Sequence, residues 1–291
     1  MLISVVIPTR NSEGKLSRTL QALYSGTHKP EEVIIVDGYS RDSTVKKARE
    51  FPVRVIYNPK VHAAAARNLG IEAANGEIIA FTDSDCVPEM TWLERIYSHF
   101  ENDSALIGVG GIMLPLPPEN DIEAFSGSVF LNEIMKFPPS SFTLERKSLA
   151  GAFITANCAY RKDALLQTGG FNEFFKNNGE DIDLFWRMLQ RHMGKLVYDP
   201  LIIIRHSFPK SYSSLVRKYI QYGIASSKLN KYHMKSPSID YFIYRKLFGH
   251  FANLLRPRES SRRTDLLYVI QLSSHIIGKL CGSLLARTVN L

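Results

Sequence analysis

Strand and helix patterns alternate through the first hundred residues, and few folds accept that alternation. Short apolar runs typical of buried strands are separated by segments whose apolar residues recur at helical spacing. Strands joined in turn by helices lie parallel with right-handed crossovers, so this order predicts an open α/β sheet covered by helices. The expected strands are 4–8, 33–36, 53–57 and 78–81, and the expected helices are 13–24, 43–51 and 63–74.

Polar residues follow three of these strands. Parallel strands end at the same edge of a sheet, and open α/β sheets bind ligands there, so these loops predict a nucleotide site. Two carboxylates one residue apart, Asp83 and Asp85, directly follow the apolar strand 78–81. Hard anionic oxygens suit Mg²⁺ or Mn²⁺, ions that bridge a protein to substrate phosphates. The first hypothesis is therefore metal-assisted chemistry on a phosphate-bearing substrate.

The patterns become less regular between residues 101 and 206. The stretch 114–147 is rich in Pro, Ser and Phe and is expected to form a loop-and-helix insert over the site. Strands are expected at 109–112, 154–160 and 197–204, and a helix at 180–191. We expect one domain over 1–206, made of halves 1–100 and 101–206, and a helical region over 207–291.

The net charge of +8 is concentrated in that last region. Residues 207–291 contain 14 Lys and Arg against 3 Asp and Glu, a net charge of +11, which leaves −3 for residues 1–206. A one-sided basic segment predicts a polyanionic partner, either nucleic acid or an anionic membrane face.

Residues 266–286 form an apolar stretch long enough to cross a bilayer. Gln271, His275 and Lys279 interrupt it, and polar groups at the bilayer centre are costly, so a helix lying in the membrane interface is an equally strong reading. Gly278 and Gly282 have the Gly-x-x-x-Gly spacing that allows close helix packing.

The cysteines and the N-terminus indicate a cytoplasmic protein. The three cysteines are widely spaced, which suits neither a disulfide framework nor a tetrahedral zinc site. The first residues read as a strand and lack the basic and apolar segments of a signal peptide. Synthesis in the cytoplasm without export is expected.

Six motifs follow one another over residues 3–206. They are Val6-Ile7-Pro8-Thr9-Arg10-Asn11, Val36-Asp37-Gly38-Tyr39-Ser40, Ala66-Arg67-Asn68-Leu69-Gly70, Asp83-Ser84-Asp85, Gly169-Gly170-Phe171 and Gly179-Glu180-Asp181 with Trp186. In this order they resemble the inverting family 2 glycosyltransferases, which have the GT-A fold. This resemblance implies a Rossmann-like, mixed nucleotide-binding sheet flanked by helices, and it does not cover residues 207–291.

The resemblance implies roles on the donor side. Asp37 would contact the nucleotide base, although Gly38 stands where the family often has a second acid, and Arg67 would face the nucleotide. Asp85 would ligate Mn²⁺ or Mg²⁺ directly, with Asp83 nearer the ribose and the water shell of the metal. His206, at the end of the last expected strand, matches a metal-coordinating histidine of related enzymes. The full set of expected donor-binding residues is Pro8, Thr9, Arg10, Asn11, Asp37, Ser40, Arg67, Asp83 and Ser84, and the expected metal ligands are Asp85, Asp83 and His206.

On the acceptor side, the resemblance makes Asp181 the catalytic base and places Glu180, Asp181 and Trp186 at the acceptor. Inversion needs a group that takes the proton of the acceptor hydroxyl while the nucleotide diphosphate leaves. Synthases that glycosylate a lipid monophosphate attack with an ionised oxygen and do not need this base. A base therefore favours a hydroxyl acceptor.

These expectations combine into one function. The protein would move a hexose from a UDP- or GDP-linked donor to a hydroxyl of a lipid-linked or other membrane-held glycan. It would act at the cytoplasmic face of the cell membrane, peripheral or monotopic, with a single-span C-terminal helix as the alternative. An anionic membrane surface is the expected partner of the basic region, and nucleic acid is not.

Two alternatives stay open, a polyprenyl-phosphate glycosyl synthase and a non-catalytic membrane- or nucleic-acid-binding protein on a degenerate sheet. A dinucleotide-dependent oxidoreductase is disfavoured because no Gly-x-Gly-x-x-Gly follows the first strand. A nucleotidyltransferase is disfavoured because no Gly- and Lys-rich loop stands there.

Overall fold

The structure is a computed structural model of the 291-residue chain. It describes all residues except 136–138, 145–152, 177, 235–239, 256–261 and 288–291. The chain divides into two compact units, and each is described by itself. The first unit comprises Met1–Leu116 and Leu131–Ser207, and the second comprises Pro117–Phe130 and Phe208–Leu291.

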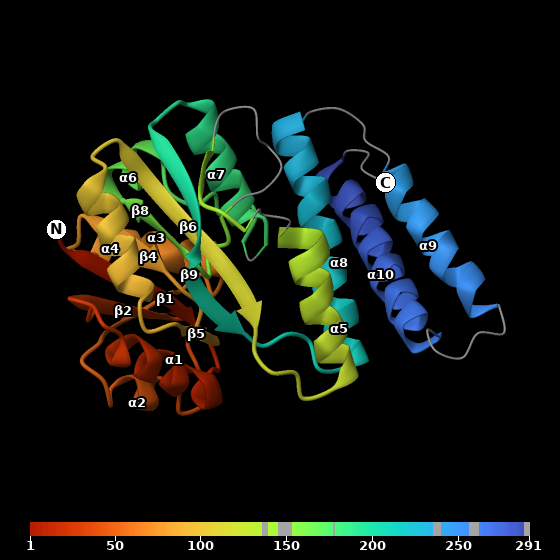
Figure 1. Ribbon diagram of the computed structural model, residues 1–291, viewed down its shortest axis with the longest axis horizontal. Coiled ribbons are helices and arrows are strands. Elements are labelled where there is room, and N and C mark those ends of the chain that lie inside the picture. The colour runs from red at the N-terminus through yellow and green to blue at the C-terminus, as the bar shows by residue number, and fades with distance from the viewer. Residues whose placement is uncertain (136–138, 145–152, 177, 235–239, 256–261, 288–291) are drawn as a thin grey trace. The chain divides into compact units, whose positions relative to one another are not determined.

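The first unit is built on one mixed sheet with the strand order β3-β2-β1-β4-β8-β6-β9-β5, and β7 pairs with β9 (Figure 1). The pairs β1–β2, β2–β3, β1–β4 and β6–β9 are parallel, and the pairs that involve β5, β7 or β8 are antiparallel. The strands are β1 (Ile3–Thr9), β2 (Glu32–Asp37), β3 (Arg54–Tyr57), β4 (Ile78–Phe81), β5 (Cys86–Pro88), β6 (Leu106–Pro115), β7 (Phe142–Leu144), β8 (Cys158–Arg161) and β9 (Lys195–His206).

Helices connect these strands. The chain runs from β1 outward to β3 and then returns to β4 on the other side of β1. This reversal puts α3 on the face of the sheet opposite to α1 and α2. The helices of this unit are α1 (Glu13–Ser25), α2 (Thr44–Ala48), α3 (Ala63–Ala73), α4 (Trp92–Asn102), α6 (Lys162–Thr168) and α7 (Glu180–Gln190).

The mixed α/β sheet predicted from the sequence is confirmed, and all seven expected elements of the first hundred residues exist. The expected strand 154–160 starts too early, since β8 begins at Cys158. The amide of Asn157 donates to the carbonyl of Ile154 at 2.8 Å, so a turn precedes the strand. The elements β5, α4, β7 and α6 were not predicted.

The second unit is helical. Its elements are α5 (Asp121–Val129), α8 (Tyr212–Leu229), the π-helical η2 (Asn230–Met234), α9 (Tyr241–Leu254) and α10 (Arg262–Ala286). The π-helical η1 (Phe130–Met135) follows α5 along the chain and belongs to the first unit from Leu131 onward. Helix α10 packs along α8 and also contacts α9 (Figure 1). The apolar cluster of this unit comprises Ile122, Phe125, Val129, Leu215, Tyr219 and Leu267.

The expected insert 114–147 is therefore divided. Residues 117–130 belong to the helical unit, and the sequence analysis had assigned them to the domain over 1–206. Residues 136–138 and 145–147 of the insert lie outside the described residues.

Candidate active site

The loops after β1 and β2 are tied together around Asp37. Asp37 is fully buried at the end of β2 and accepts the backbone N–H of Ser40 at 2.8 Å and its hydroxyl at 2.5 Å. The hydroxyl of Ser40 in turn accepts the backbone N–H of Asn11 at 2.8 Å. Asn11 and Tyr39 both have positive φ, 49° and 56°, so both loops make tight turns here. The expected base-contacting residue is thus buried, and both of its carboxylate oxygens accept hydrogen bonds from Ser40.

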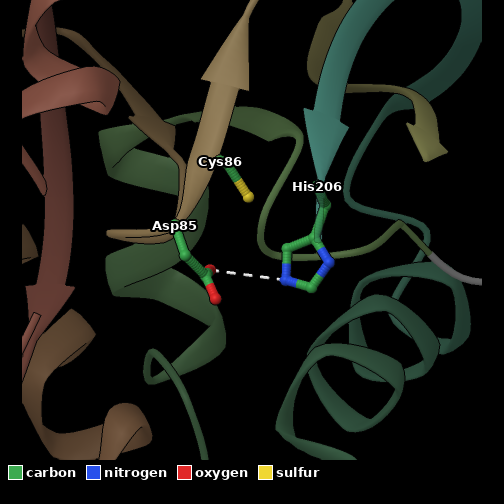
Figure 2. Close-up of side chains that lie close together, drawn as sticks. All are labelled: Asp85, Cys86 and His206. Atoms are coloured by element: carbon green, nitrogen blue, oxygen red, sulfur yellow. Dashed lines mark ion pairs between the residues drawn. The ribbon is translucent and has the colours of Figure 1, made fainter. Parts of the chain in front are cut away.

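Asp85, which directly precedes β5, meets His206 at the end of β9 (Figure 2). Cys86 on β5 lies opposite His206 on β9 in the antiparallel register, which brings Asp85 Oδ1 to 3.3 Å from His206 Nε2. Lys15 on α1 donates to the other carboxylate oxygen of Asp85 at 3.1 Å. Burial opposes the ionisation of Asp85, but His206 and Lys15 together outweigh it and hold the pKa of this carboxyl well below its usual range. Asp85 is therefore a carboxylate at neutral pH.

This cluster fits a divalent cation. One ligand atom each from Asp85, Cys86 and His206 lie within 4.8 Å of one another. Burial and the carboxylates of Asp83 and Asp85 raise the pKa of the Cys86 thiol well above its usual value, so this sulfur stays protonated and is a poor ligand. A carboxylate and an imidazole remain, and Mn²⁺ accepts both whereas Mg²⁺ prefers oxygen. Asp83, an expected ligand, does not belong to this group of three.

Asp83 pairs with Arg67 instead. Arg67 is only 3% exposed, and its guanidinium donates to Asp83 Oδ1 at 3.0 Å and to Glu180 Oε1 at 2.7 Å. The guanidinium carbon also lies 5.6 Å from the centre of the Phe171 ring. Arg67 therefore connects the loop after β4 to the first turn of α7.

Helix α7 begins with the two expected acceptor-side acids. Gly179 precedes them with φ 89°, a left-handed conformation that favours glycine. Burial raises the pKa of Glu180 to about 7 although Arg67 opposes the shift, and burial also raises the pKa of Asp181. Among the described residues, Glu180 Oε2 has no hydrogen-bond partner. Two carboxyl groups with raised pKa at one helix start are typical of a proton-transfer site.

The Gly169-Gly170-Phe171 turn fixes the position of α7. Arg187 on α7 donates to the carbonyls of Thr168 and Gly170 at 2.8 and 2.7 Å. The side chain of Asn68 on α3 exchanges two hydrogen bonds with the backbone of Phe171, at 2.9 and 2.8 Å. Gly170 has φ 65°, and a Cβ there would lie 2.6 Å from Asn68 Oδ1. The motif is therefore a structural clamp between α3 and α7.

Other expected residues lie around the same edge of the sheet. Pro8 and Thr9 end β1, and Arg10 follows them, exposed. The hydroxyl of Ser84 lies 2.9 Å from that of Ser12. Trp186 is half-buried on α7, between one and two turns after Asp181.

Two features of the site were not predicted from the sequence. Lys15 carries no signal in the sequence, because it is one of several charged residues on α1. Tyr39 and Tyr57 stack with ring centres 5.7 Å apart and are 56% and 48% exposed. They follow β2 and end β3, so the adjacent strand ends of a parallel sheet could have indicated this aromatic pair.

A mixed sheet with an Asp-x-Asp loop at its ligand-binding edge and an acidic helix start defines the GT-A class of nucleotide-sugar-binding folds. The model of the family described as "Glycosyl transferase family 2" matches residues 4–169, more than half of the chain, and this chain belongs to that family. The family predicted from the sequence is confirmed.

One curated relative is the pre-mycofactocin glycosyltransferase of Mycobacterium tuberculosis, 26% identical over 235 residues, which are 79% of this chain and 48% of the relative. The chain thus spans about half the length of that relative. A mannosyltransferase from Pyrobaculum calidifontis, solved with GDP-Man and Mn²⁺, aligns with TM-score 0.54 and 17% identity over 98% of this chain and 73% of its own. TarS residues 1–349 of S. aureus, solved with UDP, align with TM-score 0.55 and 15% identity over 96% of this chain and 90% of that chain. These likenesses confirm the fold.

Proposed function

We propose that this chain is a metal-dependent inverting glycosyltransferase that moves a hexose from a nucleotide sugar to a hydroxyl of a membrane-held glycan. The observation that carries the proposal is the position of Arg67. Its guanidinium bonds both Asp83 beside the metal cluster and Glu180 beside Asp181. Donor-side and acceptor-side carboxylates thus belong to one connected site.

The donor would lie along the strand ends. Asp37 and Ser40 would receive the nucleoside, with the exposed Tyr39–Tyr57 pair beside them. Asp85 and His206 would hold the divalent cation, whose chemistry is to neutralise charge on the departing diphosphate. The structural neighbours were solved with GDP-Man and with UDP, so GDP-linked and UDP-linked sugars are the two candidate classes of donor.

Asp181 would be the catalytic base. It would take the proton of the acceptor hydroxyl as that oxygen bonds to the anomeric carbon and the bond to the diphosphate breaks. Attack from the opposite face inverts the configuration without a covalent intermediate. A raised pKa suits this role because a stronger base removes a hydroxyl proton more readily near neutral pH. Glu180, with one oxygen unpaired among the described residues, and Trp186 would contact the acceptor.

The acceptor would be a lipid-linked saccharide or another glycan held at the cytoplasmic face of the membrane. The net charge of +11 over residues 207–291 supports attraction to an anionic surface. Helix α10 is long and apolar enough to cross a membrane by length and composition, and 44% of its candidate span is buried inside the protein. We propose a peripheral or monotopic protein, with a single span as the alternative.

A polyprenyl-phosphate synthase is the second candidate. Its acceptor is already ionised, so it would not depend on Asp181. The raised pKa of Asp181 at the start of α7 favours the hydroxyl acceptor.

The test is a panel of UDP- and GDP-linked sugars, each with Mn²⁺ or Mg²⁺, on the wild type, Asp85→Ala and Asp181→Asn. One donor should bind only with metal, Asp85→Ala should abolish that binding, and Asp181→Asn should bind the donor but transfer the sugar about 10²- to 10⁴-fold more slowly. If no donor binds with any metal while the protein still binds polyanions, the non-catalytic reading replaces this one. If Asp181→Asn keeps transfer to a polyprenyl phosphate, the second candidate replaces it.

A further inference from the structure

Helix α9 carries a face of large apolar side chains that no described element covers. In the helical unit α9 packs against α10, where the His250 ring stacks on Tyr268 with centres 4.2 Å apart and Lys246 lies over the same ring. His250 Nδ1 also lies 2.6 Å from Asp265 Oδ1. None of the residues of α9 is buried. The α9 face consists of Tyr241 at 75% exposed, Phe242 at 61%, Phe248 at 74%, Phe251 at 51% and Leu255 at 76%.

This face is continuous along the helix. Tyr241, Phe248 and Leu255 follow one another at intervals of seven residues, which is two helical turns, so they form a single stripe. Phe251 lies beside that stripe, about 60° around the helix from Phe248, and Phe242 lies at the other edge of the exposed side, about 120° from Phe248. Single exposed apolar residues are ordinary, but five large ones gathered on one helix indicate a binding surface.

The charges of this region select the partner. Residues 207–291 carry a net +11, and the α9 face contains a cation of its own, Arg245, whose guanidinium lies 5.7 Å from the ring centre of Phe242. Two copies of so basic a region repel each other, whereas an anionic lipid surface attracts both. Aromatic rings combined with Arg and Lys are typical of helices that lie at the headgroup level of a bilayer.

Helix α10 packs against α8 through one face, while Ile277 and Leu280 on its other side are 50% and 45% exposed. A Cβ added at Gly278 would lie 2.1 Å from the carbonyl oxygen of Ile220, so the two helices are in backbone contact there. The hydroxyl of Ser227 on α8 donates to the carbonyl of Lys279 at 2.9 Å. Lys279 is 4% exposed and pairs with Asp240 at 3.7 Å. The polar groups that would be costly in lipid are thus placed inside the helical unit.

We propose that the α9 face is the membrane-binding surface of this protein and lies in the plane of an anionic phospholipid bilayer, with α10 as the internal support of α9. This inference rests on the proposed function only for its biological purpose, since binding to the membrane would bring the active site to a lipid-linked acceptor. The binding itself needs neither donor nor acceptor.

The test is flotation of the full chain with phosphatidylcholine vesicles, with and without phosphatidylglycerol. The wild type should float with the anionic vesicles, and the double variant Phe248→Ser, Phe251→Ser should bind on the order of tenfold more weakly because less apolar area enters the lipid. The matched control is Leu284→Ser, Leu285→Ser on α10, where the side chains are 81% and 73% exposed. That control should float like the wild type. Flotation of the α9 variant at the wild-type level, or loss of flotation in the α10 control, overturns the proposal.

Two further measurements test the orientation of α9 in the membrane and the alternative that its face binds a second copy of the chain. In the variant Phe248→Trp, lipids brominated near the headgroup should quench the fluorescence of the new tryptophan more than lipids brominated at the end of the acyl chain. The reverse order contradicts an in-plane helix. A wild-type dimer in solution that the α9 double variant dissociates would identify the face as an interface between copies. Donor binding measured on the same variants keeps a failure of the proposed function separate, because the substitutions lie outside the active site.

Discussion

Asp181 is the residue on which the proposed chemistry depends most directly. Replacing it with Asn keeps the size and removes the base, so transfer should fall by about 10²- to 10⁴-fold while the Kd of the donor stays unchanged. The rate of the wild type should fall as pH decreases through the raised pKa of Asp181, since the protonated acid cannot accept a proton. Initial rates across pH, together with donor titrations, check this. A variant with unchanged rates would remove Asp181 from the mechanism.

Lys15 would compete with a bound cation for Asp85. Its ammonium is 3.1 Å from Asp85 Oδ2 and 58% exposed, so the pair is worth little but must be broken or shared when a metal binds. Lys15→Ala should therefore bind Mn²⁺ about two- to fivefold more tightly in the absence of donor. The control is Lys47→Ala, a surface lysine paired with Glu50 away from the cluster. Calorimetric titration that shows weaker Mn²⁺ binding in Lys15→Ala would assign the lysine to the site itself.

Glu180 should make the stability of the protein depend on pH. Its pKa in the folded protein is about 7 against an ordinary value of 4.5, so between these values the folded state holds more protons than the unfolded state. The contribution of Glu180 to the free energy of unfolding is therefore fully present below pH 4.5, and it is lost as pH rises through 7. In Glu180→Gln the Tm should fall less between pH 5 and pH 7 than in the wild type, because glutamine does not titrate. Thermal unfolding of both proteins from pH 5 to pH 8 measures the difference, and parallel curves would contradict the assignment.

At the scale of elements, the short strand β5 and the bulge in β9 decide where His206 lies. The register between β6 and β9 shifts between Gly111 and Ile112. The Asn157 side chain fills this irregularity by donating to the carbonyls of Ile112 and Ile202 at 2.8 and 2.9 Å and accepting from Trp92 Nε1 at 2.7 Å. One amide thus satisfies three buried backbone and side-chain groups.

Asn157→Leu should therefore destabilise the protein by about 3 kcal/mol or more, because it leaves those groups buried without partners. It should also weaken Mn²⁺ binding, since β9 carries His206 beyond the bulge. Urea unfolding and metal titration measure the two effects. Asn102→Leu is the control, an exposed amide that donates to the carbonyl of Ser98. Equal stability of the two variants would show that Asn157 is not a support of the bulge.

Some of these elements could be predicted from the sequence and others could not. The strands β1 to β4 were predicted because their apolar runs and the helical spacing between them are local patterns, and the Asp-x-Asp loop follows directly from the end of β4. The site around it depends on pairings between distant segments. Nothing local in Cys86–Pro88 indicates a strand, because β5 exists only through its antiparallel partner β9. Arg67 likewise shows no trace in sequence of its bonds to Asp83 and Glu180, since Glu180 lies 113 residues further along the chain.

On the scale of the whole molecule, the helical unit is assembled from two distant segments. Helix α5 leaves the chain of the first unit at Pro117 and packs with helices that begin after Phe208. Its apolar side chains Ile122, Phe125 and Val129 are at most 9% exposed, and Phe125 meets Tyr268 edge to face with ring centres 4.8 Å apart. Composition alone did not reveal this, because the stretch around α5 has the Pro, Ser and Phe content of a loop.

A chain shortened to residues 1–207 should therefore aggregate, although it ends where the sheet ends. Without α8 and α10, the apolar face of α5 has no partner in the helical unit, and an exposed patch of this kind drives association. Light scattering and binding of a hydrophobic dye should both exceed those of the full chain at equal concentration. Adding Ile122→Ser, Phe125→Ser and Val129→Ser to the short chain should restore solubility, whereas the same substitutions in the full chain should lower its Tm, because there they remove packing from the core cluster of the helical unit. A soluble, dye-free short chain without these substitutions would show that α5 does not need the C-terminal helices.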